Sequence, residues 1–222
     1  MQRVDKKPIL KRLLSNNSYQ LKVTIYSKEK KILRSTTAML QSVQKKTTRE
    51  IYESHRSRRP PKLMSSLILW LHNVRSMHNV GSAFRTADAF GIRSVFLSGY
   101  TPAPPRPEIT KTALGADESV SWRQSADPFD HLRWCRENGY TLSGLEQTHE
   151  SRLLTGYHPR PDSQICLLFG NEVTGIETNL LTHCDSLLEI PQFGKKHSFN
   201  ISVSLGIACY HFLYISLPSK EK

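Results

Sequence analysis

The chain has 222 residues, with 31 Lys and Arg against 19 Asp and Glu and a formal net charge of +12 at pH 7. This length suits one domain of ordinary core size, or one domain with an extension, and no apolar run reaches the roughly 18 residues that a membrane span needs. Its four cysteines show neither CxxC pairing nor metal-like spacing with histidine, which argues against a metal site and indicates a reduced, intracellular protein.

The excess positive charge lies entirely in the first quarter of the chain. Residues 1–62 contain 17 Lys and Arg against 4 Asp and Glu, a net charge of +13, whereas residues 63–222 contain 14 against 15, a net charge of −1. We therefore divide the chain into a basic N-terminal extension, 1–62, and a core domain, 63–222. A segment this basic suits an acidic polymer such as a nucleic acid, because each phosphate that it neutralises releases counterions. The alternative is a solvated tail that keeps the protein soluble.

Within the extension, one helix is predicted around residues 37–52, and the rest is expected to become ordered only on binding a partner. A hinge into the core domain is expected at residues 58–61, where two arginines precede two prolines. The N-terminus has the basic content of a transit peptide but lacks a clean amphipathic stripe, so we expect a cytoplasmic protein, with an organelle address as the alternative.

The first elements of the core domain are a strand and a helix. Leu67–Leu71 is uncharged and strongly apolar, as a strand covered on both faces should be. After a loop, the pattern predicts a helix from about residue 80 to residue 90, with Asn79 as its N-cap and Gly91 as its C′ residue. The apolar face of this helix is expected to pack on the sheet, which turns Arg85 toward solvent.

Strands and helices then continue to alternate. The sequence predicts a strand over 94–98, a short helix over 108–113, an amphipathic helix over 127–138 and a strand over 140–145, before a polar connection leads back to Ile165. Such alternation indicates an α/β fold with a parallel sheet and helices on both faces.

The C-terminal third holds two strand ends and one helix start. Ile165–Phe169 reads as a buried strand that ends in a tight, glycine-containing loop, and Leu187–Pro191 reads as a second short strand. Ser198 is the expected N-cap of an apolar helix over 200–214, whose small residues suit close packing against its own sheet or another subunit. Because open α/β folds bind ligands at the carboxyl edge of the sheet, we expect a ligand crevice here.

Four segments of the core domain resemble the motifs of a known family. The segments LLFGNEVTGI, EIPQF and HSFNISVSLGIACY are similar to the second and third motifs of the SpoU family of RNA methyltransferases, in the α/β-knot (SPOUT) superfamily. The first motif is matched upstream by HNVRSMHNVGSAFRTADAFG, at Asn79, Gly81 and Arg85. The resemblance covers most of residues 67–215. It implies an RNA ribose 2′-O-methyltransferase that uses S-adenosylmethionine, and a deep trefoil knot formed by the C-terminal third.

The resemblance also implies a cofactor site. It places backbone groups of Gly170, Ile190 and Phe199 around S-adenosylmethionine, with Leu168 and Pro191 nearby, and apolar walls of this kind suit an adenine ring. Phe199 stands where family members commonly carry leucine, a change that can reshape the adenine pocket. No GxGxxG follows a strand, which argues against a dinucleotide-fold methyltransferase or dehydrogenase.

The polar motif positions that would carry the chemistry are Arg85, Asn79, Glu172, Ser198 and Asn200. The resemblance nominates Arg85 as the group that contacts and activates the ribose 2′-hydroxyl. Because a guanidinium has a pKa above about 12, Arg85 is either an activated base or an orienting donor. Asn79 and Asn200 would hold the ribose or Arg85, and Glu172 would orient one of these groups.

Each of these residues also has a structural alternative. Arg85 can form a surface ion pair with Asp88, three residues on along the helix. Asn79 and Ser198 can cap helices, and Glu172 can brace its own loop.

Basic residues are the expected RNA contacts, and they are Arg58, Arg59, Lys111, Lys195 and Lys196. For the three lysines a solvated side chain is the alternative. His197, which follows the last of them, can titrate near neutrality. Because members of the family work as homodimers, we expect a homodimer with the helix over 200–214 at the contact, and neither a metal nor a membrane as a partner.

The expected function is methyl transfer from S-adenosylmethionine to a ribose of tRNA or, second, of rRNA. The preference for tRNA follows from the size of the chain and from a short basic extension in place of a separate RNA-binding domain. Two alternatives remain open. One is a basic RNA-binding or assembly protein that has the fold without catalysis, and the other is a knotted enzyme that methylates a base.

Overall fold

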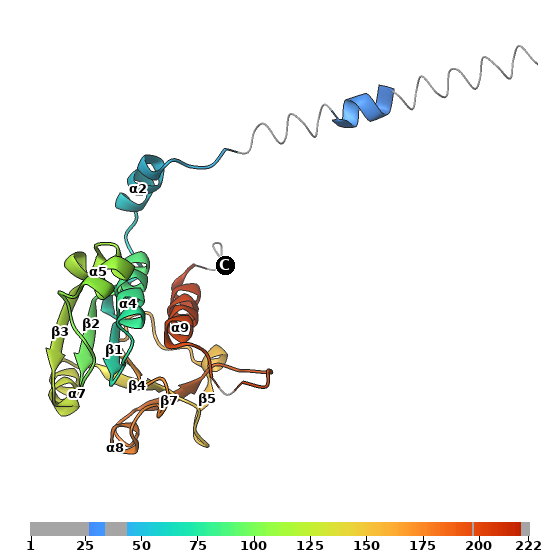
Figure 1. Ribbon diagram of the computed structural model, residues 1–222. Coiled ribbons are helices and arrows are strands. Elements are labelled where there is room, and N and C mark those ends of the chain that lie inside the picture. The colour runs from blue at the N-terminus through green and yellow to red at the C-terminus, as the bar shows by residue number, and fades with distance from the viewer. Residues whose placement is uncertain (1–26, 34–43, 197, 219–222) are drawn as a thin grey trace, which may run out of the picture. The chain divides into compact units, whose positions relative to one another are not determined.

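The computed structural model describes residues 27–33, 44–196 and 198–218 (Figure 1). Part of the predicted helix over 37–52, and His197, lie outside the described residues. The chain divides into two compact units, Met1–Arg58 and Arg59–Lys222, which we describe separately.

The N-terminal unit contains the helix α2 (Thr48–Arg56), and residues 27–33 are also helical. A capping box fixes the start of α2, because Thr47 Oγ1 accepts from the Glu50 N–H and the Glu50 carboxylate accepts from the Thr47 N–H. The predicted helix over 37–52 is therefore wrong at 44–47, which lie before the first residue of α2, and wrong at its end, because α2 continues to Arg56. No residue of α2 is buried.

The second unit is built on one sheet of seven strands, in the order β3-β2-β1-β6-β4-β7-β5. Every neighbouring pair in it is parallel. The strands are β1 (Ile68–His72), β2 (Ser94–Ser98), β3 (Ser121–Ser125), β4 (Thr141–Leu145), β5 (Arg152–Leu153), β6 (Ile165–Phe169) and β7 (Ser186–Glu189). The parallel sheet confirms the predicted α/β class, and it places the carboxyl ends of β1, β6, β4 and β7 along one edge.

Helices cover both faces of this sheet, as predicted. They are α3 (Lys62–Ser66), α4 (Met77–Phe90), α5 (Pro107–Ala113), α6 (Ala116–Ser119), α7 (Pro128–Glu137), α8 (Thr178–Leu181) and α9 (Ile201–Ser216). The strand β1 is buried throughout and alternates between two cores: Leu69 and Leu71 join the cluster under α4 and α9, and Trp70 joins the cluster under α7.

The close packing of α4 on α5 accounts for the glycine of the first motif. A Cβ atom on Gly81 would lie 2.6 Å from the carbonyl oxygen of Ile109 and 2.8 Å from the Cβ atom of Thr112. Only a residue without a side chain allows this approach, and α4 in turn carries the other first-motif side chains.

Two predicted N-caps are wrong. The cap of α4 is Ser76, whose Oγ accepts from the Asn79 N–H, so Asn79 lies inside the first turn with its side chain available for another partner. The cap of α9 is Asn200, whose Oδ1 accepts from the Ser202 N–H at 2.8 Å, and Ser198 lies before the helix. In both places a second capping residue stands within three positions of the predicted one.

Other predictions are confirmed within one or two residues. Gly91 ends α4 in the left-handed conformation with φ 64°, as a C′ glycine should. The strand predicted over 187–191 is shorter and ends at Glu189. The trefoil knot stays a prediction. Within the described part of the chain, no helix combines the length and apolar character that crossing a membrane requires.

Candidate active site

A cavity of about 290 Å³ lies at the carboxyl ends of β4, β6 and β7 and beside the start of α9. Its volume is close to the lower end of the range for small-molecule sites, about 300 to 1,000 Å³. It is lined by Leu145, Glu146, Gln147, Phe169, Gly170, Asn171, Glu172, Val173, Gly175, Glu189, Ile190, Gln192, Ser198, Phe199, Ile201 and Ser204. The predicted crevice at this edge of the sheet is therefore present.

The cavity wall includes Gly170, Glu172, Ile190, Ser198 and Phe199 from the set of predicted site residues. Leu168, Asn79, Arg85, Pro191 and Asn200 do not line it. Leu168 is fully buried in the core on the face of α7, because successive residues of β6 point to opposite faces and it is Phe169 that faces the cavity.

The loop after β6, residues 170–177, turns tightly at the cavity wall, and we call it the β6 loop. Asn171 and Gly175 exchange two backbone hydrogen bonds of 3.0 Å. Gly175 has φ 69°, and a Cβ atom on Gly170 would lie 2.2 Å from the carbonyl carbon of Gly175. Both glycines of the second motif are therefore required by the turn itself.

Glu172 ties the β6 loop to the first motif. Its carboxylate accepts from the N–H groups of Arg75 and Ser76, at 3.1 and 3.2 Å, and from Asn79 Nδ2 at 3.0 Å. Burial opposes ionisation, but these donors outweigh it, so the pKa of Glu172 lies below its ordinary value. The Glu172 carboxylate therefore does brace its loop, as the structural alternative proposed. It does so partly through Asn79, a residue of the first motif.

Glu146 is a cavity residue that sequence reasoning missed. It follows β4 directly, and its carboxylate accepts from the N–H of Ile176 at 2.9 Å and from the N–H of Gln147 at 3.0 Å. It therefore holds the second half of the β6 loop, whereas Glu172 ties the first half to the segment after β1. The sequence did offer one indication of this role, because Glu146 is the first polar residue after a buried strand, at the carboxyl edge where ligands bind.

All the charged side chains in the described lining of the cavity are acidic. It contains three carboxylates, Glu146, Glu172 and Glu189, and no Lys, Arg or His. The Glu189 carboxylate makes no hydrogen bond or ion pair with the described part of the chain, so it is free to face a ligand. A site of this composition favours a ligand that carries positive charge.

Arg85 lies outside the cavity, on the exposed side of α4. It is six residues beyond Asn79, about 9 Å along the helix axis. The alternative ion pair with Asp88 is not formed, because Asp88 accepts from Ser119 Oγ at 3.1 Å and Arg85 has no polar partner among residues 44–196 and 198–218. Its guanidinium therefore faces solvent.

The two polar residues of the third motif have different positions. Ser198 lines the cavity, whereas the side chain of Asn200 is engaged as the cap of α9 by Ser202. The predicted RNA contacts are all exposed, with Arg58 in the N-terminal unit and Arg59, Lys111, Lys195 and Lys196 in the second unit.

Comparison with known proteins places these features in a family. The SpoU rRNA Methylase family model matches residues 66–210. The 23S rRNA (guanosine-2′-O-)-methyltransferase RlmB of Neisseria meningitidis serogroup B is 34% identical over 141 residues, which are 64% of this chain and 55% of that protein. RlmB of Vibrio vulnificus is 30% identical over 161 residues, 72% of this chain and 63% of that protein.

A solved structure gives the same assignment. The AdoMet-bound rRNA methyltransferase from Sinorhizobium meliloti superposes with a TM-score of 0.65 at 25% identity, over 72% of this chain and 62% of that one. The chain thus spans less than two thirds of the length of each of these three proteins. With the family model matched over residues 66–210 and the second and third motifs meeting at one cavity, the chain belongs to the SpoU rRNA methylase family.

Proposed function

We propose that the chain is an S-adenosylmethionine-dependent RNA ribose 2′-O-methyltransferase. The observation that carries the proposal is the cavity, where the second and third motifs meet and where Glu172 connects them to Asn79 of the first motif. Relatives that are at least 30% identical are named as guanosine 2′-O-methyltransferases of 23S rRNA, which supports the same chemistry.

The cavity fits the cofactor in shape and charge. Phe169, Ile190 and Phe199 provide apolar walls for adenine, and strand-end backbone at Gly170 and Ile190 provides polar groups for its edges. The three glutamates in the lining make the cavity suitable for a cofactor that carries a sulfonium and an ammonium group. When bound, S-adenosylmethionine supplies an electrophilic methyl group.

The chain's own residues position the reactants. Holding two reactants in line can supply about 7 to 11 kcal/mol of the barrier, so geometry is the main contribution that we expect from the site. Glu172 and Asn79 fix the β6 loop at the cavity wall, and Ser198 presents a hydroxyl there. We assign Arg85 to the ribose hydroxyl as an orienting donor, since a guanidinium offers several N–H donors and no acceptor.

RNA is the proposed substrate, and the N-terminal extension is its proposed accessory contact because it carries a net charge of +13 over residues 1–62. The relatives' names favour rRNA as the first substrate to test, and the preference for tRNA stays a prediction. A cytoplasmic location also stays a prediction.

We also propose a homodimer through α9. One side of this helix exposes a row of large apolar residues, Val203, Ile207, Tyr210 and Tyr214, spaced three or four positions apart. Such a row on an otherwise apolar helix suits a partner subunit. Light scattering that shows a stable and active monomer would refute this arrangement.

Calorimetric titration with S-adenosylmethionine tests the proposed function. We expect saturable binding to the full-length chain, with S-adenosylhomocysteine as a competitor for the same site. A non-catalytic RNA-binding protein has no need for the cofactor, so the absence of binding at saturating concentrations would overturn the proposal.

A further inference from the structure

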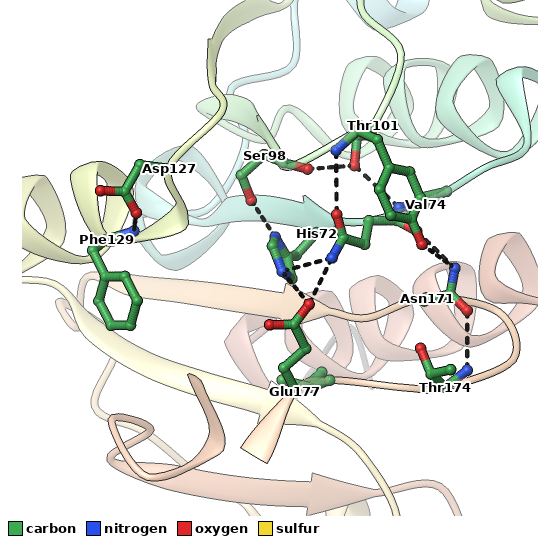
Figure 2. A network of polar contacts seen from close by, with 12 residues as sticks. His72, Val74, Ser98, Thr101, Asp127, Phe129, Asn171, Thr174 and Glu177 are labelled. Carbon is green, nitrogen blue, oxygen red and sulfur yellow. Dashed lines mark hydrogen bonds and ion pairs between the residues drawn. The ribbon is translucent and has the colours of Figure 1, made fainter. Parts of the chain in front are cut away.

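A second set of polar contacts, outside the cavity, joins the end of β1 to the β6 loop (Figure 2). Its centre is Asn73, the first residue after β1, which adopts the left-handed conformation with φ 56°. The Asn73 N–H donates to the Ser98 carbonyl oxygen, and Asn73 Oδ1 accepts from the Tyr100 N–H, both at 3.2 Å. Asn73 is therefore held from two sides by the end of β2.

The other half of the Asn73 amide reaches the far end of the β6 loop. Asn73 Nδ2 donates to Glu177 Oε1 at 2.8 Å, and the same oxygen lies 3.5 Å from Nε2 of His72. Figure 2 shows the Glu177 carboxylate pointing at the His72 ring. Burial lowers the pKa of His72 despite the opposing effect of Glu177, so near pH 7 this ring is mainly neutral. The contact of Asn73 with Glu177 is the shorter one, and Asn73 Nδ2 also lies 3.1 Å from His72 Nε2, so the amide is in contact with both side chains.

The near end of the β6 loop is tied to the same residue. Asn171 Nδ2 donates to the Asn73 carbonyl oxygen at 2.8 Å and to the Tyr100 hydroxyl at 2.9 Å, while its Oδ1 accepts from the N–H groups of Val173 and Thr174. Asn73 therefore contacts the β6 loop at both ends, through its backbone at Asn171 and through its side chain at Glu177.

Glu172 lies between these two contacts. Its backbone donors, Arg75 and Ser76, follow Asn73 by two and three residues. A shift of Glu177 relative to Asn73 would therefore move the loop that carries Glu172, Gly170 and Gly175 along the cavity wall. Errors of about 1 Å in such positions cost catalysis heavily.

We propose that Asn73 and Glu177 are a pair of positioning residues that set the β6 loop for cofactor binding. Neither side chain lines the cavity, so the pair acts through the loop and does not touch the ligand. The inference rests on the proposed function for its binding readout, and its conformational readout is independent of that function.

Exchanging the two groups gives a direct test. Asn73→Asp keeps the left-handed conformation accessible and keeps an acceptor for the Tyr100 N–H, but it places a second carboxylate 2.8 Å from Glu177. Glu177→Gln keeps an acceptor oxygen for Asn73. The double variant N73D/E177Q restores the hydrogen bond with donor and acceptor reversed, and it restores a single negative charge in the pair. Asn179→Asp is the matched control, because it adds a charge two residues after Glu177 at an exposed side chain.

Two measurements are made on each full-length variant: hydrogen exchange of peptides covering the β6 loop, and calorimetric titration with S-adenosylmethionine. We expect Asn73→Asp to speed exchange in the loop and to weaken cofactor affinity by about tenfold or more, because it removes the hydrogen bond and sets two carboxylates against each other. We expect E177Q and N179D to remain close to wild type, and N73D/E177Q to recover most of the affinity lost in N73D. Thermal unfolding of the same variants separates this effect from general destabilisation.

Two results would overturn the pair: exchange and affinity in N73D that match N179D, or a double variant as impaired as N73D. If the wild-type chain binds no S-adenosylmethionine, the proposed function fails, and the exchange data alone then decide whether Asn73 and Glu177 hold the loop.

Discussion

Two of the loops that line the cavity are held in different ways. The β6 loop is fixed by its own Asn171 and Glu172, which bond to the segments after β1 and β2, and by Glu146 after β4, which accepts from the Ile176 N–H. The loop over 191–199, between β7 and α9, makes no hydrogen bond at its described residues, and Phe193 within it is 99% exposed. A segment with few contacts opens at little free-energy cost, whereas a densely bonded one opens only with the surrounding structure.

The two loops are therefore expected to contribute differently to folding and to cofactor binding. The β6 loop gives the site its shape before any ligand binds, so substitutions there should lower both the free energy of unfolding and the cofactor affinity. Substitutions in the loop over 191–199 should leave the free energy of unfolding unchanged. Arg85, which belongs to neither loop and has no polar partner in the described part of the chain, should affect transfer alone.

The largest effect is expected at Arg85. Arg85→Ala should lower the rate of methyl transfer by at least about 100-fold, because removal of one transition-state donor typically costs that much. Cofactor affinity should stay within a few fold of wild type. Transfer is measured under single-turnover conditions, with Arg93→Ala, another exposed arginine, as the control. An unchanged rate would remove the role assigned to this side chain.

A glycine substitution in the β6 loop should affect folding and binding together. Gly170→Ala places a Cβ atom 2.2 Å from the backbone of Gly175, so the turn must open, and the free energy of unfolding should fall by about 1 to 3 kcal/mol. Gly156→Ala is the control, since nothing lies within 4 Å of a Cβ atom there. Urea unfolding measures the difference, and equal midpoints for the two variants would contradict the rigid turn.

Glu172→Gln should have a smaller effect that depends on pH. The pKa of Glu172 is lower in the folded chain than its ordinary value of 4.5, so its contribution is present above pH 4.5 and is lost as pH falls through the folded pKa. We expect a difference of about 1 kcal/mol between wild type and variant at pH 7, which narrows as pH falls below 4.5. A difference that is constant across this range would show that the carboxylate charge contributes nothing.

Phe193→Ala should have the smallest effect on stability. Because this ring is 99% exposed, its removal should change the free energy of unfolding by less than about 0.5 kcal/mol. Urea unfolding at pH 7 is again the measurement. A loss above about 1 kcal/mol would mean that the loop over 191–199 is packed more firmly than its contacts indicate.

The elements that sequence reasoning found are those whose own residues determine them. Ile165–Phe169 is predicted to the residue because a short, uncharged apolar run between polar segments is typical of a buried strand. The edge strand β3, Ser121–Ser125, was not predicted, since it is polar and largely exposed. Its pairing with β2 exists only in the folded sheet.

The missed site residues depend on partners that are far away in the chain. Glu146 meets Ile176 at a separation of 30 residues, and Asn73 meets Glu177 at a separation of 104. The cap of α4 was misplaced for a related reason. Asn79 is a good capping residue by type, but Ser76 occupies the cap and the Asn79 amide is bound to Glu172, 93 residues away. The local sequence pattern thus identifies the motif residues, but which of them contact one another is determined only by the tertiary structure.

Nucleoside mass spectrometry tests the central claim most directly. Purified chain is incubated with isotopically labelled S-adenosylmethionine and with unmodified rRNA and tRNA, and the digested nucleosides are resolved. We predict that the label enters a 2′-O-methylated nucleoside and that Arg85→Ala abolishes its incorporation. Label found on a base, or on no nucleoside from either RNA, would contradict the account.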